Sequence, residues 1–330
     1  MTREVKQMTR EVKQLKSQLG KMLNWNEARI DFLVRLLIAL IKVKTVNLAE
    51  LARAFISKAE ESSRYRRIQR FLKESKLSEE EIAKVIMPMM GRIGRKKIIL
   101  DRTEWKFGQE VINILVLAVQ YGGVAVPLWW QVRERRGNSD TQMRIELLEK
   151  YVKRFGSQSI EYVTGDREFI GIEWIGYLQE QGIDFRIRIK KDAVITHNDD
   201  FIDIQESLEP LTQEQPRYLT DCTIYGHHVN LSATKLKNNE YLLLIGNDNP
   251  EHFREDYQVR WDIEELFGCL NSRGFNFEDT HLTEPHKISK IMAVLTMAFI
   301  WAVQTEQWLN PIQPITKKKT LKRSLKSIFR

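Results

Sequence analysis

The sequence of 330 residues has little cysteine, and what it has is scattered. Cys222 and Cys269 stand alone, so they supply neither a disulfide framework nor a Cys-x-x-Cys zinc pattern. The six histidines show no zinc-ligand spacing either. These absences exclude a small disulfide-stapled or zinc-stapled fold, and they favour a protein of the reducing cytoplasm.

Long apolar runs and cofactor motifs are also missing. No stretch reaches the roughly 18 uncharged apolar residues that a membrane span needs, so no membrane partner is predicted. The N-terminus alternates charged residues with single apolar ones and lacks the apolar core of a signal peptide. A Gly-x-x-x-x-Gly-Lys-Ser/Thr loop is absent, so no nucleotide cofactor is implied. No Ser, Cys or His stands out as a nucleophile.

The charge that is present is unevenly placed. The net charge is +8, yet residues 1–100 hold 23 Lys and Arg against 11 Asp and Glu, an excess of 12 that leaves the remaining residues near −4. A basic end on a mildly acidic body favours a module that binds a polyanion, and nucleic acid is the polyanion we expect. With 42% hydrophobic residues, the chain is long enough to fold as two or three modules.

The first residues contain a repeat. Met1–Gln7 and Met8–Gln14 are the same seven residues, and the apolar positions keep an alternating spacing of four and three through residue 22. This spacing predicts an amphipathic helix over residues 1–23, which can pair with a second copy as a short coiled coil. The alternative is a harmless duplication that forms a frayed helix.

Residues 24–94 are predicted to be helical. Ile30–Val43 is a nearly continuous apolar helix, Asn47 can cap a second helix, and Ser62 or Ser63 can cap a third. The third helix carries four arginines near its start: Arg64, Arg66, Arg67 and Arg70. Two short helices with a basic second one fit a DNA reader of the helix-turn-helix kind. The alternative is an ordinary three-helix domain with a solvated basic face.

From residue 95 the apolar period changes from helical to strand-like. The elements expected in chain order are the strands Lys97–Leu100, Val111–Val119 and Val124–Val132, the helix Thr141–Phe155, the strand Glu161–Thr164, the helix Ile172–Glu180 and the strand Phe185–Ile189. Residues 191–249 break this pattern and predict a β-rich insertion with strands Tyr218–Tyr225, His228–Thr234 and Tyr241–Ile245. A long apolar helix, Lys287–Trp308, then closes the core, and residues 311–330 form a basic tail.

One helix is predicted over Asp256–Arg273, with Gly274 to end it. Four polar residues fall on one stripe of this helix: Tyr257, Arg260, Glu264 and Asn271. An adjacent apolar stripe suits burial against a core. Glu265 lies about 100° round the helix from Glu264. An ordinary solvated face with an Arg–Glu pair is the alternative interpretation.

Two aspartates follow predicted strands. Asp101 comes directly after the first strand of the core, and Asp166 comes after a later one. Either alone would be read as a turn residue, but together with Glu264 they make a set of three carboxylates. Hard cations such as Mg²⁺ take oxygen ligands of this kind. Two such ions can activate water and stabilise the leaving 3′ oxygen during attack on a phosphodiester.

The helix with the polar stripe resembles the Tyr-(2)-Arg-(3)-Glu-(6)-Lys signature of the insertion-sequence transposases of the IS-four group, part of the DDE superfamily. Tyr257, Arg260 and Glu264 match this signature in spacing, and Asn271 replaces its Lys. The segments D-R-T-x-W around Asp101 and G-D-R-x-F around Asp166 are also similar to those of the family. The resemblance covers most of residues 96–308.

The resemblance implies an α/β fold: an RNase H-like mixed sheet with flanking helices, formed by residues 95–190 and 250–310. An all-helical N-terminal domain would precede it, and the β-rich insertion would lie before the last catalytic helix. The implied function is a cut-and-paste DNA transposase, an endonuclease of DNA recombination that binds terminal inverted repeats in double-stranded DNA. It would act in the nucleoid as a homodimer in a synaptic complex.

The same resemblance assigns roles to residues. Asp101, Asp166 and Glu264 would be catalytic and would hold two Mg²⁺ ions per site, with Mn²⁺ able to substitute. Tyr257, Arg260 and Asn271 would contact DNA near the cut. Because Asn271 carries no charge and Arg273 lies about 160° from Tyr257 round a regular helix, we expect a weakened enzyme. A non-catalytic transposase that only binds its DNA, and a structure-specific nuclease with the same carboxylates, remain alternatives.

Overall fold

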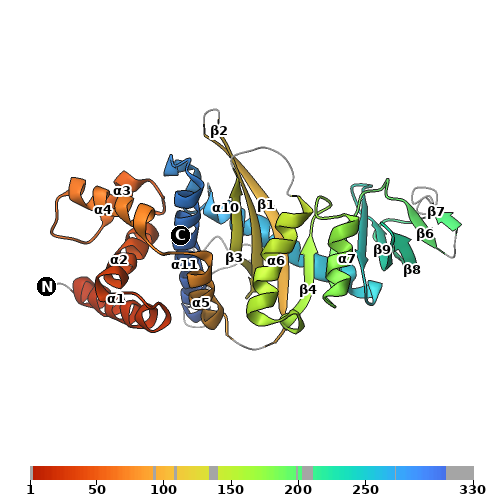
Figure 1. The fold of residues 1–330 in the computed structure, drawn as a ribbon, viewed down its shortest axis with the longest axis horizontal. Coiled ribbons are helices and arrows are strands. Elements are labelled where there is room, and N and C mark those ends of the chain that lie inside the picture. Colours follow the sequence, from red (N-terminus) through yellow and green to blue (C-terminus); the bar gives the residue numbers. More distant parts are fainter. Residues whose placement is uncertain are drawn as a thin grey trace.

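The computed structural model describes residues 3–91, 94–107, 110–133, 140–197, 200–202, 211–271 and 273–309. The basic tail predicted over residues 311–330 lies outside them. A ten-stranded mixed sheet in the order β3-β2-β1-β4-β5-β10-β9-β8-β6-β7 forms the centre of the molecule. The N-terminal helices lie beyond β3 at one end, and β6 and β7 form the other end, so the molecule is elongated (Figure 1).

The N-terminal part is helical, as predicted. Its helices are α1 (Arg3–Met22), α2 (Glu27–Val43), α3 (Leu48–Ala54), α4 (Glu61–Glu74) and α5 (Glu79–Met89). Asn47 caps α3, because its side chain accepts hydrogen bonds from the N–H groups of Ala49 and Glu50. The predicted serine cap of α4 is wrong. This helix starts one residue before Ser62, and Glu60 at its N-cap makes no side-chain capping bond within the described chain.

Helix α1 packs on its own chain. Leu15, Leu19 and Leu23 are each 6% exposed or less, and α1 contacts α2 and α5. Lys16 at the side of this seam pairs with Glu27 at 2.8 Å. The leucines that follow the seven-residue repeat are therefore used inside the monomer, and these side chains are not available to pair with a second copy.

The first five strands of the sheet follow the predicted order. They are β1 (Lys96–Phe107), β2 (Glu110–Tyr121), β3 (Val124–Arg133), β4 (Ile160–Gly165) and β5 (Phe185–Arg188). The first three are antiparallel neighbours, and β4 and β5 add to β1 in parallel. The helices α6 (Thr141–Phe155) and α7 (Ile172–Glu180) connect them and cover one face (Figure 1). This order is consistent with the RNase H-like core that the resemblance implies.

One expectation about β1 is wrong. The strand was predicted to end at Leu100, because the apolar run stops there, but β1 continues to Phe107. Strand β2 pairs with it along this length, from Ile98 opposite Val119 to Trp105 opposite Ile112 and beyond. Asp101 therefore lies inside a long strand rather than at its end.

The strands of residues 191–249 continue the same sheet. They are β6 (Ile195–His197), β7 (Asp200–Ile202), β8 (Pro216–Ile224), β9 (His227–Lys235) and β10 (Tyr241–Gly246). Strand β10 pairs antiparallel with β5, and β9 pairs with β10. Gly246 permits this close approach, since a Cβ atom there would lie 2.4 Å from the carbonyl oxygen of Phe185.

The predicted helix over residues 256–273 is wrong at both ends and in the middle. The segment consists of α9 (Phe253–Tyr257), a tight 3₁₀ turn (Gln258–Arg260) and α10 (Trp261–Leu270). A 3₁₀ turn at 257–260 changes the angle between neighbouring side chains from that of a regular helix. Other 3₁₀ turns lie at Ser157–Ser159, Pro250–His252 and Phe277–Thr280.

Helix α11 (Pro285–Leu309) closes the core and joins it to the N-terminal helices. It packs on β3 and on α2, α4 and α5. Among the described residues it is the one helix with the length and composition of a membrane span, over Pro285–Trp308. However, 67% of that apolar window is buried inside the protein, which a core helix shows equally well.

Candidate active site

Two of the three predicted carboxylates lie close along the sheet: Asp101 is on β1, and Asp166 directly follows the neighbouring β4. Leu100 of β1 pairs in parallel with Gly165 of β4, so Asp101 and Asp166 each follow one residue later at the same level of the sheet. The Asp101 carboxylate is 16% exposed and accepts a 2.7 Å hydrogen bond from the Arg102 N–H. Burial raises its pKa to about 6, and the charges of Glu168 and Asp166 act in the same direction.

A salt bridge fixes these two strands to each other. Arg102 points from β1 to Glu168 in the turn after β4, with Nη2 3.0 Å from Oε2 and Nε 3.2 Å from Oε1. Both side chains are about a fifth exposed, so the fork-like pairing is partly shielded from water. No local pattern in the sequence predicts this pair, because its two residues lie 66 positions apart.

Tyr257 closes one side of the carboxylate pair. Its hydroxyl donates to Oδ1 of Asp166 at 3.3 Å, and the residue is 5% exposed. Burial raises the pKa of the phenol well above its ordinary value, so the hydroxyl keeps its proton and stays a donor. Tyr257 therefore orients Asp166 from the end of α9.

Arg260 links the third carboxylate to the first. Its Nη1 lies 2.7 Å from Oε1 of Glu264 and 3.8 Å from Oδ2 of Asp101. The arginine is 6% exposed, and its guanidinium lies 4.8 Å from the centre of the Trp261 ring. The structure thus brings Asp101, Asp166, Glu264, Tyr257 and Arg260 into one cluster.

A buried network centred on Arg186 anchors α9 to the sheet. Arg186 of β5 is 4% exposed, and its Nε and Nη2 pair with Asp256 at 3.0 Å and Asp248 at 2.6 Å. Its guanidinium lies between the rings of Tyr162 and Phe253, at 5.0 and 4.7 Å from their centres. Since Asp256 precedes Tyr257, this network holds the segment that carries Tyr257 and Arg260 against the sheet. Sequence reasoning missed Arg186.

The two neighbouring glutamates of α10 have different partners, as the helix geometry predicts. Glu264 pairs with Arg260, whereas Glu265 pairs with Arg273 at 2.9 Å. Arg273 folds back on α10, where its Nη2 lies 3.4 Å from the backbone carbonyl oxygen of Glu264, but its salt bridge is with Glu265, off the stripe of Tyr257 and Glu264. The reason is that α10 ends at Leu270 and the chain reverses.

The place predicted for Asn271 is wrong for the same reason. Asn271 is the C-cap of α10, with φ −93° and ψ −133°, and it does not continue the stripe of Tyr257 and Glu264. Its Oδ1 is buried and has no hydrogen-bond partner among the described residues.

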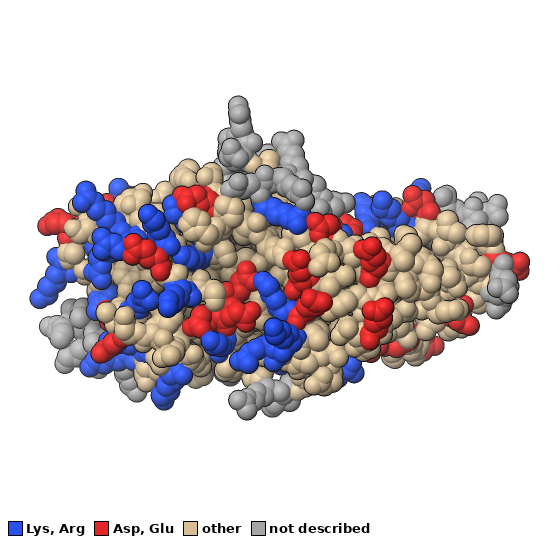
Figure 2. All heavy atoms as spheres, viewed as in Figure 1, with Lys and Arg blue, Asp and Glu red and all other residues tan. Residues whose placement is uncertain are grey.

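The predicted DNA-binding arginines of α4 differ in their surroundings. Arg64 is partly buried and donates to the carbonyl oxygen of Phe55 at 2.9 Å, so it has a structural role. Arg66, Arg67 and Arg70 are exposed, and Arg67 lies over the Phe32 ring at 5.4 Å. Lys and Arg side chains gather over these N-terminal helices at the left end of the face in Figure 2.

The carboxylates fit a hard divalent cation in their chemistry. Asp101 and Asp166 offer oxygen ligands side by side, and the raised pKa of Asp101 reflects burial with negative neighbours, which a cation would relieve. Glu264 is held by Arg260 instead. Accordingly, no group of three His, Cys, Asp or Glu side chains is gathered as a metal site in the described part of the chain. Asp101 and Asp166 would hold the ion, and Glu264 would complete the set after leaving Arg260.

Binding of the ion should be measurable without DNA. We expect Mn²⁺ to raise the melting temperature of the protein, because an ion that binds only the folded state stabilises it by about 2.7 kcal/mol at 100 times its Kd. The shift should disappear in Asp101→Asn and persist in Glu265→Gln, whose carboxylate faces Arg273. Differential scanning calorimetry checks this, and an unchanged shift in Asp101→Asn would contradict it.

Comparison with known proteins identifies the family. A sequence model described as the transposase DDE domain matches residues 93–301, more than half of the 330 residues. No curated protein matches. The solved NurA nuclease from Sulfolobus solfataricus is similar over 78% of this chain and 97% of its own, at 12% identity and a TM-score of 0.27, which is too low to carry an argument. The chain belongs to the transposase DDE domain family.

Proposed function

We propose that this transposase cuts and pastes DNA. It would hydrolyse the phosphodiester at each end of its element and use the freed 3′-OH to attack target DNA, with a metal ion on the carboxylates. The observation that carries the proposal is the cluster of Asp101, Asp166 and Glu264 with Tyr257 and Arg260, reached from three separate segments of a chain in this family. The order of β1 to β5 supports an RNase H-like core beneath it.

Each residue has a role that its contacts support. A bound divalent cation supplies the Lewis acid for phosphodiester cleavage, with two ions in the full mechanism. Asp101 and Asp166, at the same level of the neighbouring β1 and β4, would bind the ion through their carboxylate oxygens. Tyr257 keeps Asp166 oriented through its hydroxyl. Arg260 holds Glu264 in place before the ion binds. Once Glu264 turns to the ion, the Arg260 guanidinium could pair with a phosphate oxygen of the DNA, because arginine binds phosphates as well as carboxylates.

Metal-dependent nicking tests this proposal. Purified protein is mixed with double-stranded DNA carrying the inverted repeat that flanks its gene, in Mg²⁺ or Mn²⁺, and the strand breaks are mapped. We expect a nick at the 3′ end of the element, followed by joining to a second DNA. If neither ion supports nicking on any end substrate, the enzymatic function is refuted.

The N-terminal helices would read the inverted repeat. We propose that α4 faces the DNA with Arg66, Arg67 and Arg70, while Arg64 holds the preceding loop. A homodimer would bring two ends together in a synaptic complex, as in the IS-four group that the signature residues resemble.

Changing Arg66 and Arg67 to Ala should weaken binding to end DNA and flatten its salt dependence. Each lost phosphate contact lowers the slope of log K against log salt by about 0.9. Lys42, an exposed cation on α2 of the same domain, provides the matched control, and Lys42→Ala should leave the slope unchanged. Fluorescence anisotropy at several salt concentrations measures both. Equal losses in the two proteins would indicate general charge attraction rather than contact by α4.

A second function has one specific observation in its favour. Asn271 stands where the family signature has Lys, and its side chain brings no charge to a phosphate. A transposase that binds its DNA ends without cutting them would show selective binding and no nicking under the same conditions.

A further inference from the structure

A pocket lies away from the carboxylate cluster, near the start of β1. It has a volume of about 500 Å³ and lies between α5, the segment that leads into β1, and the end of α6. Its residue Lys96 starts β1, five residues before Asp101, which is about 17 Å along an extended strand. The pocket is therefore separate from the catalytic cluster, and its size is typical of a ligand site.

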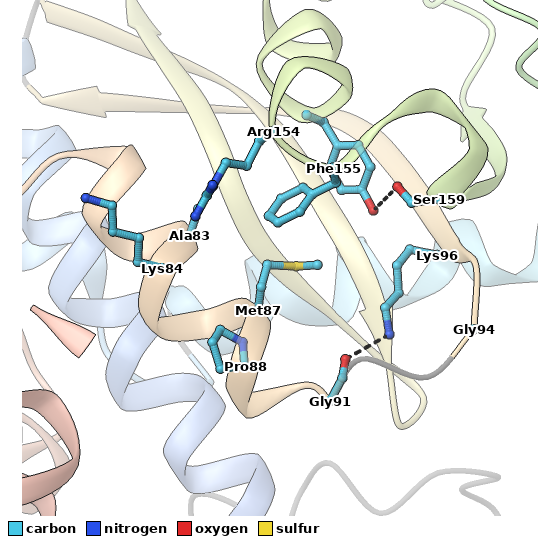
Figure 3. A pocket seen from close by; sticks show the side chains of 11 residues that line it. Ala83, Lys84, Met87, Pro88, Gly91, Gly94, Lys96, Arg154, Phe155 and Ser159 are labelled. Atoms are coloured by element: carbon cyan, nitrogen blue, oxygen red, sulfur yellow. Dashed lines mark hydrogen bonds between the residues drawn. The ribbon is translucent and has the colours of Figure 1, made fainter. Parts of the chain in front are cut away.

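The lining combines cations with an apolar centre. Lys84, Lys96 and Arg154 are basic, and none of the residues described around the pocket is acidic. Figure 3 shows Phe155 and Met87 side by side in the middle, with Lys84 and Arg154 on one side and Lys96 on the other. An anion with an apolar or aromatic part would satisfy both kinds of surface.

The aromatic centre is held rigidly. The Phe155 ring lies 5.9 Å from the centre of Trp129 and 5.1 Å from that of Tyr151, and both of those residues are fully buried. Phe155 itself is only partly buried, so one side remains available. A fixed ring that needs no reordering is a good surface for stacking.

Lys84 and Arg154 are exposed to solvent, and Lys96 is partly buried. Lys84 pairs with Glu81 at 2.6 Å on the surface, and Lys96 donates to the carbonyl oxygen of Gly91 at 3.3 Å. Arg154 is exposed, with its guanidinium 5.8 Å from the Phe155 ring. Lys84 is 47% exposed in this pair, and ion pairs with an exposed partner contribute little to stability, so a phosphate can displace the glutamate.

We propose that this pocket binds an unpaired nucleotide in a single-stranded segment of DNA. Proteins that bind single strands combine basic grooves, which follow the phosphates, with aromatic rings on which the bases stack. Here Phe155 would lie against the base, and Lys84, Lys96 and Arg154 would contact the flanking phosphates. The inference rests on the proposed function only in taking DNA as the polymer that the protein handles.

The test compares a ten-nucleotide thymidine strand with a blunt duplex of the same length. Phe155→Leu keeps an apolar side chain but removes the stacking ring, so it should weaken binding to the single strand about 5-fold or more. Its affinity for the duplex should change less. The double variant Lys84→Gln, Arg154→Gln should lower the salt slope for the single strand by about 1.4, at about 0.7 per phosphate.

Lys153 provides the matched control for Arg154. It is the preceding residue on α6, is exposed, and does not line the pocket. Lys153→Gln should keep the slope and affinity of the unaltered protein. Equal losses in Lys153→Gln and the double variant, or full single-strand affinity in Phe155→Leu and the double variant, would overturn the proposal. The double variant changes exposed side chains, so it stays informative if Phe155→Leu unfolds.

Nicking of end DNA by the unaltered protein separates this inference from the proposed function. If the protein nicks end DNA but binds the thymidine strand independently of Phe155 and Arg154, only the pocket proposal fails. If it binds the strand through these residues but never nicks, only the proposed cleavage fails.

Discussion

Asp166→Asn should lower the single-turnover rate of nicking on end DNA by about 10³-fold or more, while its affinity for that DNA stays nearly unchanged. A metal ion contributes several kcal/mol of transition-state stabilisation, and each 1.36 kcal/mol is tenfold in rate. Asn keeps the size of the side chain and can still meet the Tyr257 hydroxyl, but it removes the charge that the ion needs. Asp101→Asn should have an effect of the same order.

Two glutamates provide the contrast for this experiment. Glu264→Gln should also be severely impaired, because it removes the carboxylate beside Arg260 and Asp101. Glu265→Gln should stay within a few-fold of the unaltered rate, since Glu265 contacts Arg273 at the surface. Rapid-quench nicking and gel-shift binding are measured on the same preparations. A dead Glu265→Gln with an active Glu264→Gln would show that the roles of these residues are reversed.

Arg186→Ala should destabilise the protein by about 3 kcal/mol, because removing one partner of a buried ion pair leaves the other charge uncompensated. The expected loss of stability lies at the lower end of the range for buried ion pairs, because Asp248 is 41% exposed and Asp256 is 20% exposed. Two ring contacts and a hydrogen bond to the Phe185 carbonyl are lost as well. The midpoint of urea unfolding measures the change.

Arg188 is the matched control for stability, two residues along the same strand. It is partly exposed, and its nearest acidic partner, Glu240, lies 4.0 Å away, so Arg188→Ala should cost less than about 1 kcal/mol. Arg186→Lys should fall between the two, because Lys keeps the charge but cannot pair with two carboxylates through a planar fork. Equal midpoints for Arg186→Ala and Arg188→Ala would show that the buried network contributes little.

Elements with a clear period and clear ends were predictable from the sequence. Helices α6 and α7 have the predicted bounds, since apolar residues recur at helical spacing and Asp140 or a glycine marks the start. The end of α10 was not predictable. There the backbone N–H of Phe275 donates a hydrogen bond to the carbonyl oxygen of Cys269 at 2.9 Å, and the N–H of Arg273 donates to the carbonyl oxygen of Gly268 at 3.0 Å. These backbone bonds cap the helix and reverse the chain before Gly274, the residue at which the sequence predicted the end.

The residues of the candidate site also fall into those that the sequence indicates and those that it does not. Carboxylates after strand-like runs and a spaced helical motif pointed to Asp101, Asp166, Glu264, Tyr257 and Arg260. The pairs of Arg102 with Glu168 and of Arg186 with Asp256 join residues 66 and 70 positions apart. Such pairing depends on which strands become neighbours, so no local pattern in the sequence indicates it.

The antiparallel pairing of β5 with β10 has a mechanical consequence. A ladder of backbone hydrogen bonds ties the strands of residues 216–246 to the strand that carries Arg186, and Arg186 in turn grips the segment leading to Tyr257. A displacement of those strands would therefore be passed to the segment before Tyr257 through backbone hydrogen bonds and the Arg186–Asp256 pair. Amide protons of β5 and β10 should then exchange with solvent together, as one cooperative unit.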